Sequence, residues 1–210
     1  QDGCNYKCSF CTIPLARGKS RSPKIETVVR NAHLLVEEGF KEIIVTGVNA
    51  GDFGSDTDEN FFQLLQALDK IDGLERLRVS SIEPNLLHDD IIRFAAESKT
   101  IQPHFHIPLQ SGSDEMLKIM RRRYRSDLYR QRVELIRTLM PDAAIGVDVI
   151  TGHPGETEKL FQESFAFIQS LDVSYLHVFT YSERPNTHGL SITPVVDKAI
   201  RKKRSHKLRR

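Results

Sequence analysis

Cysteine is scarce in this chain, with three among 210 residues, all within the first eleven positions. Three clustered cysteines are a poor disulfide framework, so we expect a reducing, cytoplasmic compartment. No uninterrupted apolar run approaches the roughly 18 residues of a membrane span, so we expect no membrane association. The N-terminus lacks Met, a basic stretch and an apolar signal core. We expect it to be a cut within a longer protein rather than a signal peptide.

Basic and acidic side chains are nearly equal in number, 30 against 28, which gives a formal net charge of +2. Hydrophobic residues make up 39% of the chain, which allows one substantial core. We therefore expect one domain over residues 1–210, with a basic C-terminal helix or tail at 195–210. The last ten residues carry seven basic side chains and no acidic one, and residues 121–125 form a second basic run. Such clusters suit phosphate contacts, although a terminal basic run is more often a solvated helix face.

Strand-like and helix-like segments alternate along the chain. Short β-branched apolar runs predict strands at 42–46, 77–81, 105–109, 145–150 and 175–180. Helical periodicity separates them, at 28–36, 61–68, 91–96, 113–120, 133–139 and 160–168. This alternation predicts an α/β fold with right-handed βαβ units and a parallel sheet. Polar or glycine-rich sequence follows four of the strands, and we expect a shared site where the carboxyl ends of the strands meet.

The cysteines are spaced as Cys4-x3-Cys8-x2-Cys11. A [4Fe–4S] cluster normally takes four thiolates, so three protein ligands would leave one iron open to another ligand. A zinc knuckle would need a histidine at a set distance, and the eight histidines are scattered. A bacterial ferredoxin site would need a C-x2-C-x2-C run and a fourth cysteine. An electron-carrying iron–sulfur protein and a zinc-knuckle RNA-binding protein are the alternatives of another class.

This cysteine motif, with Phe10 just before the last cysteine, resembles that of the radical S-adenosylmethionine (SAM) enzymes. The resemblance implies a partial (β/α)6 barrel of the TIM type, whose first strand would lie almost wholly upstream of Gln1. It also implies that the open iron binds SAM and that the reduced cluster cleaves SAM to a 5′-deoxyadenosyl radical. The electron would come from a reductant such as flavodoxin or ferredoxin.

Further motifs resemble those of the methylthiotransferases within this superfamily. They lie at 1–4, 11–22, 46–49, 108–113, 120–124 and 152–157. Segments 46–52, 80–84 and 177–185 are most similar to the branch that acts on threonylcarbamoyladenosine at position 37 of tRNA, in the anticodon loop. Other branches act on isopentenyladenosine in tRNA or on a ribosomal protein. The resemblance implies a monomer, with a second [4Fe–4S] cluster in an N-terminal domain and an RNA-binding β-barrel, both outside this chain.

The resemblance also assigns residue roles by position. Cys4, Cys8 and Cys11 would bind the SAM-activating cluster. The remaining candidates would contact SAM or substrate: Phe10, Gly47, Asn49, Ser81, Glu83, Gln110, Ser111, Arg122, Gly152 and Pro154. Among these, Arg122 would pair with the SAM carboxylate, because a guanidinium matches a carboxylate, with phosphate or surface contact as the alternative. His153 stands where the family commonly has phenylalanine.

Overall fold

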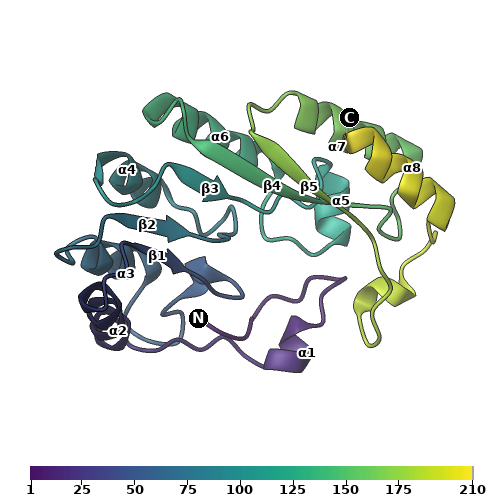
Figure 1. Ribbon diagram of the computed structural model, residues 1–210. Coiled ribbons are helices and arrows are strands. Elements are labelled where there is room, and N and C mark those ends of the chain that lie inside the picture. Colours follow the sequence, from purple (N-terminus) through teal and green to yellow (C-terminus); the bar gives the residue numbers. More distant parts are fainter. Residues whose placement is uncertain (210) are drawn as a thin grey trace.

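The computed structural model describes residues 1–209, which form a curved sheet of parallel strands covered by helices (Figure 1). The strands are β1 (Glu42–Val45), β2 (Arg76–Val79), β3 (His104–His106), β4 (Ala144–Thr151) and β5 (Tyr175–Thr180). β1 pairs with β2, and β3, β4 and β5 pair in that order. Parallel bridges between Leu77 and Ile101 and between Ser81 and His106 join the two parts. All five predicted strands are confirmed.

The order of the strands in space follows their order in the chain. A doubly wound sheet would instead reverse its strand order at a switch point. Sequential parallel strands with right-handed crossovers place every helix on the same, outer face, as in a (β/α) barrel. The sheet of the described residues is open and not closed into a barrel. The predicted partial barrel is therefore confirmed as a fold class.

The covering helices are those that the periodicity predicts. They are α2 (Ile25–Glu37), α3 (Phe61–Leu68), α4 (Asp89–Glu97), α5 (Asp114–Ile119), α6 (Ser126–Leu139) and α7 (Glu158–Gln169). α3 begins with a capping box, in which Asn60 accepts from the Gln63 amide and Gln63 accepts from the Asn60 amide. α7 begins at Thr157, whose hydroxyl accepts from the Leu160 amide. α2 gives way to Gly39 in the left-handed region, with φ of 96°.

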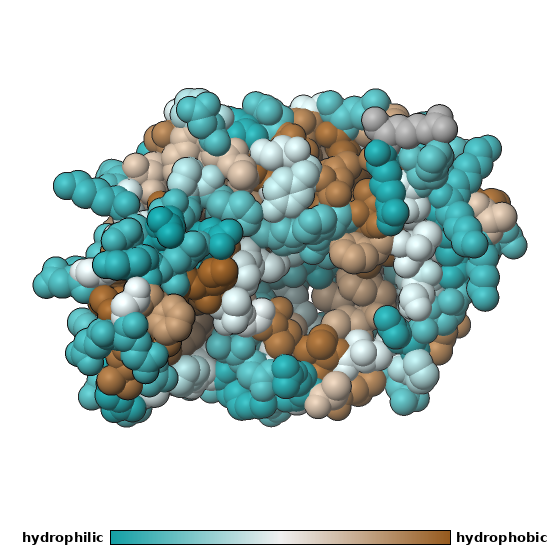
Figure 2. All heavy atoms as spheres, viewed as in Figure 1, coloured by the Kyte–Doolittle hydropathy of each residue, from teal (hydrophilic) through white to brown (hydrophobic). Residues whose placement is uncertain are grey.

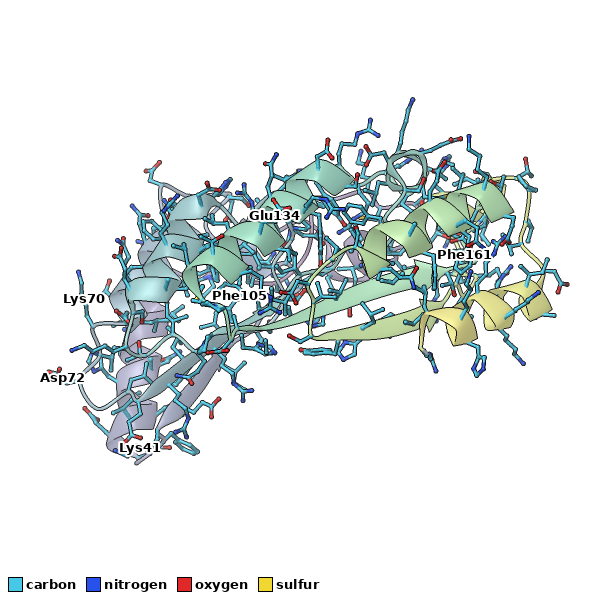
Figure 3. All side chains as sticks on the ribbon, turned by 90° about the horizontal axis from the view of Figure 1, so that it is seen from above. Lys41, Lys70, Asp72, Phe105, Glu134 and Phe161 are labelled. Carbon is cyan, nitrogen blue, oxygen red and sulfur yellow. The ribbon has the colours of Figure 1, made fainter. Side chains whose placement is uncertain are left out.

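The hydrophobic core lies between the sheet and these helices. Figure 3, seen from above, places Phe105 of β3 under the helices. Leu77, Ile107 and Ile145 are fully buried on the helix-facing side of the strands. Each such side chain stabilises the fold by about 1.5–3 kcal/mol through burial. The opposite, concave face of the sheet carries polar side chains, and this leaves it available for a site.

Three short elements and one helix complete the chain. The short ones are α1 (Ile13–Arg17), η1 (Ala50–Asp52) and η2 (His188–Ser191). α8 (Lys198–Leu208) packs against β5 and β4 and lies beside α7 (Figure 1). α8 holds much of the basic C-terminal segment, yet Arg201 and Arg204 are buried in it. Those two arginines face the protein, so only part of the basic run is free for phosphate. None of the helices described is long and apolar enough to cross a membrane.

Candidate active site

The three cysteines lie in the loop that precedes α1, and all three are half-buried free thiols. Cys4 Sγ accepts a hydrogen bond from the Tyr6 amide at 3.4 Å, and Cys11 Sγ accepts one from the Ile13 amide at 3.4 Å. The Cys11 amide donates to the Cys8 carbonyl at 3.2 Å, which turns the loop between these two residues. Amide donors aimed at sulfur stabilise thiolates and tune a cluster bound to them.

The spacing of the three sulfurs fits a cluster better than a single ion. A tetrahedral zinc ion with Zn–S bonds of about 2.3 Å holds its thiolates about 3.8 Å apart. Within residues 1–209 the three cysteine sulfurs do not come within 4.8 Å of one another as a set. A [4Fe–4S] cluster offers a separate iron to each thiolate, so its ligands stand further apart than those of one ion. Cys4, Cys8 and Cys11 are therefore suited to hold such a cluster.

Ser9, between the second and third cysteines, is fully buried and fixes the loop from three sides. Its amide donates to the Met120 carbonyl at 3.1 Å, at the end of α5. Its carbonyl accepts from the Gly189 amide at 2.6 Å, in η2. Its hydroxyl lies 2.8 Å from Nε2 of His153, in the loop after β4. We call this set of contacts the Ser9 clamp.

His153 is fully buried, and its contacts define its tautomer. Nδ1 lies 2.7 Å from the carbonyl of Pro154, which can only accept, so Nδ1 carries the proton. Nε2 then accepts from the Ser9 hydroxyl. Burial lowers the pKa of His153 to about 4, so the ring is neutral at pH 7. The ring packs edge-on against Phe10 and Tyr181, with centroids 6.1 and 5.1 Å away. At this position, histidine supplies an acceptor for the cysteine loop as well as an aromatic ring.

Arg122 links the cysteine loop to the second strand end. Its guanidinium donates to Cys8 Sγ at 3.0 Å and to the Tyr124 hydroxyl at 3.1 Å, and it forms an ion pair with Glu83. The Tyr124 hydroxyl in turn donates to the carbonyls of Pro108 and Leu109. Burial raises the pKa of the Cys8 thiol, and the Arg122 charge opposes that rise. The predicted SAM partners Arg122 and Glu83 thus pair with each other in this structure.

The neighbouring arginine of the same basic run also contacts the cysteine loop. Arg123 donates to the Asn5 carbonyl at 3.1 Å, and its guanidinium lies over the Tyr6 ring, 3.9 Å from the centroid. Tyr6 is buried, and its hydroxyl accepts from the Asn85 side chain at 2.7 Å. The run at 121–125 therefore contributes two of its arginines to positioning the cysteines.

Gly47 and Asn49 follow β1 and lie against Gln1. A Cβ atom on Gly47 would come within 3.2–3.3 Å of three Gln1 atoms, so glycine permits this approach. The backbone N–H of Asn49 donates to the side-chain oxygen of Gln1 at 2.9 Å. The side chain of Asn49 is buried, and its Oδ1 and Nδ2 atoms have no hydrogen-bond partner in the described chain. A buried, unpaired amide needs a ligand or water, because leaving it unpaired costs about 1–3 kcal/mol.

A cavity of about 300 Å³ opens on the concave side between the cysteine loop and the last strands. Its lining includes Phe10, Gln110, Asp148, Phe179 and Arg184. Gln110 adopts φ of 65°, where the chain turns after pairing with Val149 of β4. Figure 2 shows the hollow on this face of the molecule, with apolar and polar side chains around it. The lining combines apolar side chains with a few polar and charged ones, as ligand sites commonly do.

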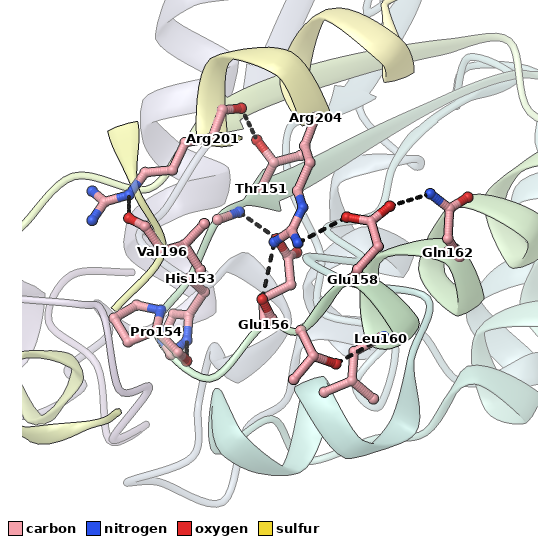
Figure 4. A network of polar contacts seen from close by, with 12 residues as sticks. Thr151, His153, Pro154, Glu156, Glu158, Leu160, Gln162, Val196, Arg201 and Arg204 are labelled. Atoms are coloured by element: carbon pink, nitrogen blue, oxygen red, sulfur yellow. Dashed lines mark hydrogen bonds and ion pairs between the residues drawn. The ribbon is translucent and has the colours of Figure 1, made fainter. Parts of the chain in front are cut away.

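The loop after β4 is fixed by a buried ion pair (Figure 4). Glu156 accepts from the Gly152 amide at 2.7 Å and pairs with Arg204 of α8 at 2.7 Å. Gly152 has φ of 75°, and a Cβ atom there would lie 2.2 Å from Cγ of Arg201. Pro154 contributes its carbonyl to His153. The predicted residues Gly152 and Pro154 thus lie in a loop that connects the Ser9 clamp to α8.

The structure brings some of the predicted residues together and separates others. Cys8, Arg122 and Glu83 are in contact, and Phe10 and Gln110 line one cavity. Ser81 forms a parallel backbone bridge with His106, where the strand order passes from β2 to β3. Ser111 is buried, and its hydroxyl accepts from the Ser113 amide at 3.3 Å.

Sequence reasoning missed Ser9, whose role depends on a contact 144 positions away. It also missed the residues facing the cavity from the strands. The two-residue alternation of β3, β4 and β5 is the signal that would have revealed them.

Solved structures of the same fold are radical SAM enzymes. Superposition on the cobalamin- and cluster-bound radical SAM methyltransferase TsrM of Kitasatospora setae gives a TM-score of 0.74 at 18% identity, covering 90% of this chain and 37% of that one. Coproporphyrinogen III oxidase (HemN) of Escherichia coli gives 0.70 at 13% identity, covering 99% and 49%. At these identities the likeness concerns the fold, which is the α/β class of the radical SAM enzymes.

The chain belongs to the Radical SAM superfamily, whose family model matches residues 1–168. Membership implies a [4Fe–4S] cluster and SAM. This confirms the superfamily expected from the cysteine motif.

Curated relatives cover nearly the whole chain. It is 43% identical over 210 residues to the threonylcarbamoyladenosine tRNA methylthiotransferase MtaB of Bacillus subtilis, and 40% identical over 204 residues to that of Aquifex aeolicus. It is 39% identical over 208 residues to the tRNA-2-methylthio-N(6)-dimethylallyladenosine synthase of Streptomyces viridosporus. These alignments cover 97–99% of this chain but 47%, 50% and 41% of the relatives. The chain thus spans about half the length of the curated relatives it matches.

Proposed function

We propose that this chain is the radical-generating core of a tRNA methylthiotransferase that acts on threonylcarbamoyladenosine at position 37. The observation that carries the proposal is the clamped loop of three cysteines beside a cavity, in a chain 43% identical to a protein named for this activity. The narrow margin over the dimethylallyladenosine synthase, at 39% identity, makes isopentenyladenosine the second candidate.

The cluster and SAM, when bound, would supply one-electron cleavage of SAM to a 5′-deoxyadenosyl radical. Cys4, Cys8 and Cys11 would hold the cluster. The unpaired side-chain amide of Asn49 would receive a polar group of SAM, next to Gly47, whose lack of a side chain admits Gln1 there. Phe10 would pack against the apolar part of SAM. Arg122, which already contacts Cys8 and Glu83, would orient the loop and present positive charge to an anionic group.

This chemistry would require that water be kept away from the reactive radical when the ligands are bound. Ser9 and His153 close the floor beneath Phe10, and neither carries a charge at pH 7. Ser81, Gln110, Ser111 and the 152–154 loop would complete the walls.

The whole protein would add partners that this chain does not contain. We propose a second [4Fe–4S] cluster in a further domain, tRNA as substrate through its anticodon loop, a flavodoxin- or ferredoxin-type reductant, a monomeric state and a cytoplasmic location. The exposed part of the basic α8 segment, including Lys202 and Lys203, would face the RNA.

The cluster test is anaerobic reconstitution with iron and sulfide, followed by electron paramagnetic resonance with and without SAM. The reduced chain should give a cluster signal that changes on SAM addition, and Cys8→Ala should lose it while keeping its helical circular dichroism. His33→Ala, on the exposed side of α2, is the matched control and should behave as wild type. A signal indifferent to SAM would contradict the open-iron assignment.

The substrate test is mass spectrometry of tRNA nucleosides from cells that lack the full-length protein. Loss of the methylthio group from threonylcarbamoyladenosine, with the unmodified precursor accumulating, is the expected result. Loss from isopentenyladenosine instead would favour the second candidate. Unchanged levels of both would reject the proposal.

A further inference from the structure

Two histidines and one aspartate meet on the concave face of the sheet, apart from the cysteines. Nε2 of His106 lies 3.0 Å from Oδ1 of Asp148, and Nδ1 of His177 lies 3.2 Å from the same oxygen. The three potential ligand atoms all lie within 4.8 Å of one another. In the part of the chain that the structure describes, no other set of histidine, cysteine or acidic side chains is this close.

The sheet itself creates this arrangement. His106, Asp148 and His177 come from the adjacent strands β3, β4 and β5, and Asp148 is the direct register partner of His177. His106 pairs with Gly146, two positions before Asp148, so its side chain points to the same face. Neighbouring strands are about 4.8 Å apart, which is close enough for three side chains on one face to share a ligand. Rigid strands, rather than loops, therefore define the geometry.

Ring contacts with Tyr175 restrict the two histidines of this cluster. The Tyr175 ring lies over Gly146, where a Cβ atom would come within 2.3 Å of Cζ. The ring centroids of Tyr175 and His177 are 5.2 Å apart, and the Tyr175 hydroxyl lies 3.0 Å from Nε2 of His104. The rings of His106 and His177 are also 5.2 Å apart, at an angle of 32°. Gly146 is therefore required for the position of Tyr175, which restricts both ligand histidines.

No lysine or arginine of the described residues pairs with the Asp148 carboxylate, so its charge is available to a cation. The side chain of Asp148 is 23% exposed, and its ion pairs among residues 1–209 are with these two histidines alone. No lysine or arginine neutralises it there. Both imidazoles direct a ring nitrogen at one carboxylate oxygen. With each ring proton on the other ring nitrogen, three lone-pair donors would lie within 4.8 Å of one another.

We propose that His106, Asp148 and His177 form a site for a divalent transition-metal ion of the zinc and iron(II) class. Ligands about 2.1 Å from an ion lie about 3.0 Å apart at right angles and about 3.4 Å apart in a tetrahedron. The two nitrogen–oxygen separations of 3.0 and 3.2 Å fall in this range. Imidazole and carboxylate donors suit these metals, and two histidines with one carboxylate leave positions open. Asp148 also lines the cavity beside Phe10 and Gln110, so the open positions would take an oxygen donor from water or from a molecule in that cavity.

The proposal rests on the strand geometry and not on the function proposed above. Its test is calorimetric titration with Zn²⁺ of the anaerobically reconstituted full chain, in which the thiolates are engaged by the cluster. Titration of the metal-free chain with Co²⁺ then gives a second readout, because thiolate-bound Co²⁺ has intense charge-transfer absorption that histidine and carboxylate ligands do not produce.

One Zn²⁺ per cluster-loaded chain is expected, and Co²⁺ should give a class of sites without thiolate absorption. Asp148→Asn and His177→Ala should weaken binding by more than the roughly 10- to 100-fold that loss of an outer-shell partner costs. Asp148→Glu, which keeps the carboxylate, should retain measurable binding, and His33→Ala should equal wild type. Circular dichroism establishes that each variant is folded.

Two outcomes would overturn the proposal. One is equal Zn²⁺ affinity for wild type and folded Asp148→Asn. The other is uptake that disappears when the cluster occupies the cysteines, with Co²⁺ absorption of thiolate type alone. Either can occur whether or not the chain responds to SAM, so failure here is distinguishable from failure of the proposed function.

Discussion

The buried ion pair between Arg204 and Glu156 should contribute more to stability than any surface pair of this chain. The two side chains are 7% and 2% exposed, and the atoms are 2.7 Å apart. Arg204 also donates to the Glu156 carbonyl at 2.9 Å and pairs with Glu158 at 3.1 Å. Its guanidinium lies over the ring of Phe161, which Figure 3 places on α7 facing α8. This contact therefore attaches α8 to the loop that carries His153.

Replacing Arg204 with Met keeps the aliphatic volume but leaves the Glu156 carboxylate buried with the Gly152 amide as its main donor. Removing one partner of a buried pair costs about 3–5 kcal/mol. For a chain of this size, 1 kcal/mol shifts Tm by roughly 2–4 °C, so Tm should fall by roughly 6–20 °C. Urea unfolding followed by circular dichroism measures the same change as a lower midpoint with an unchanged slope.

The stability lost in Arg204→Met should depend on pH and should be greater at higher pH. Burial raises the pKa of Glu156, and Arg204 opposes that rise. Without Arg204 the pKa of Glu156 rises further, and protonation removes the buried charge. The folded variant then binds a proton that the unfolded chain releases, so the destabilisation should be largest near pH 8 and should shrink towards about pH 5.

Two further variants make the reasoning refutable. Lys41→Gln breaks an exposed pair with Glu75 and should cost about 0–1 kcal/mol. The double variant Arg204→Met/Glu156→Leu removes both charges and should recover part of the loss. If Arg204→Met costs no more than Lys41→Gln, the pair does not attach α8 in the way described.

Four other variants test three separate features. The pKa of His153 is lowered to about 4, so the folded state resists protonation and stability should fall as pH drops from about 6.5 to 4. His153→Gln should flatten that acid limb in a plot of unfolding free energy against pH, and an unchanged limb would assign it to other groups. Gly152→Ala places a methyl group against the Arg201 side chain at a residue with positive φ. It should lower the free energy of unfolding by more than about 3 kcal/mol, seen as a lower urea midpoint. An unchanged midpoint would mean that the loop relaxes. Asn60→Ala removes the α3 cap and should cost about 1 kcal/mol in thermal unfolding, with Gln63→Ala costing less.

The fold was largely predictable because strand and helix periodicities are local properties of the sequence. The five apolar runs became β1 to β5, and their sequential parallel order gave the open barrel. The cysteine motif was recognisable because its three cysteines lie within eight positions. The partners of Arg122 were not readable, since Cys8 is 114 and Glu83 is 39 positions away. The burial of Arg204 was likewise hidden, because a basic helix face carries no local sign that an acidic loop will cover part of it.

The Ser9 clamp ties the cysteine loop to three separate parts of the fold without using a cysteine side chain. A flexible loop would lose about 1–2 kcal/mol of conformational freedom per residue on closing round a cluster. Here the Ser9 amide, carbonyl and hydroxyl each hold a different part of the fold. If Cys4, Cys8 and Cys11 take up a cluster, most of that entropic cost has therefore already been met in folding.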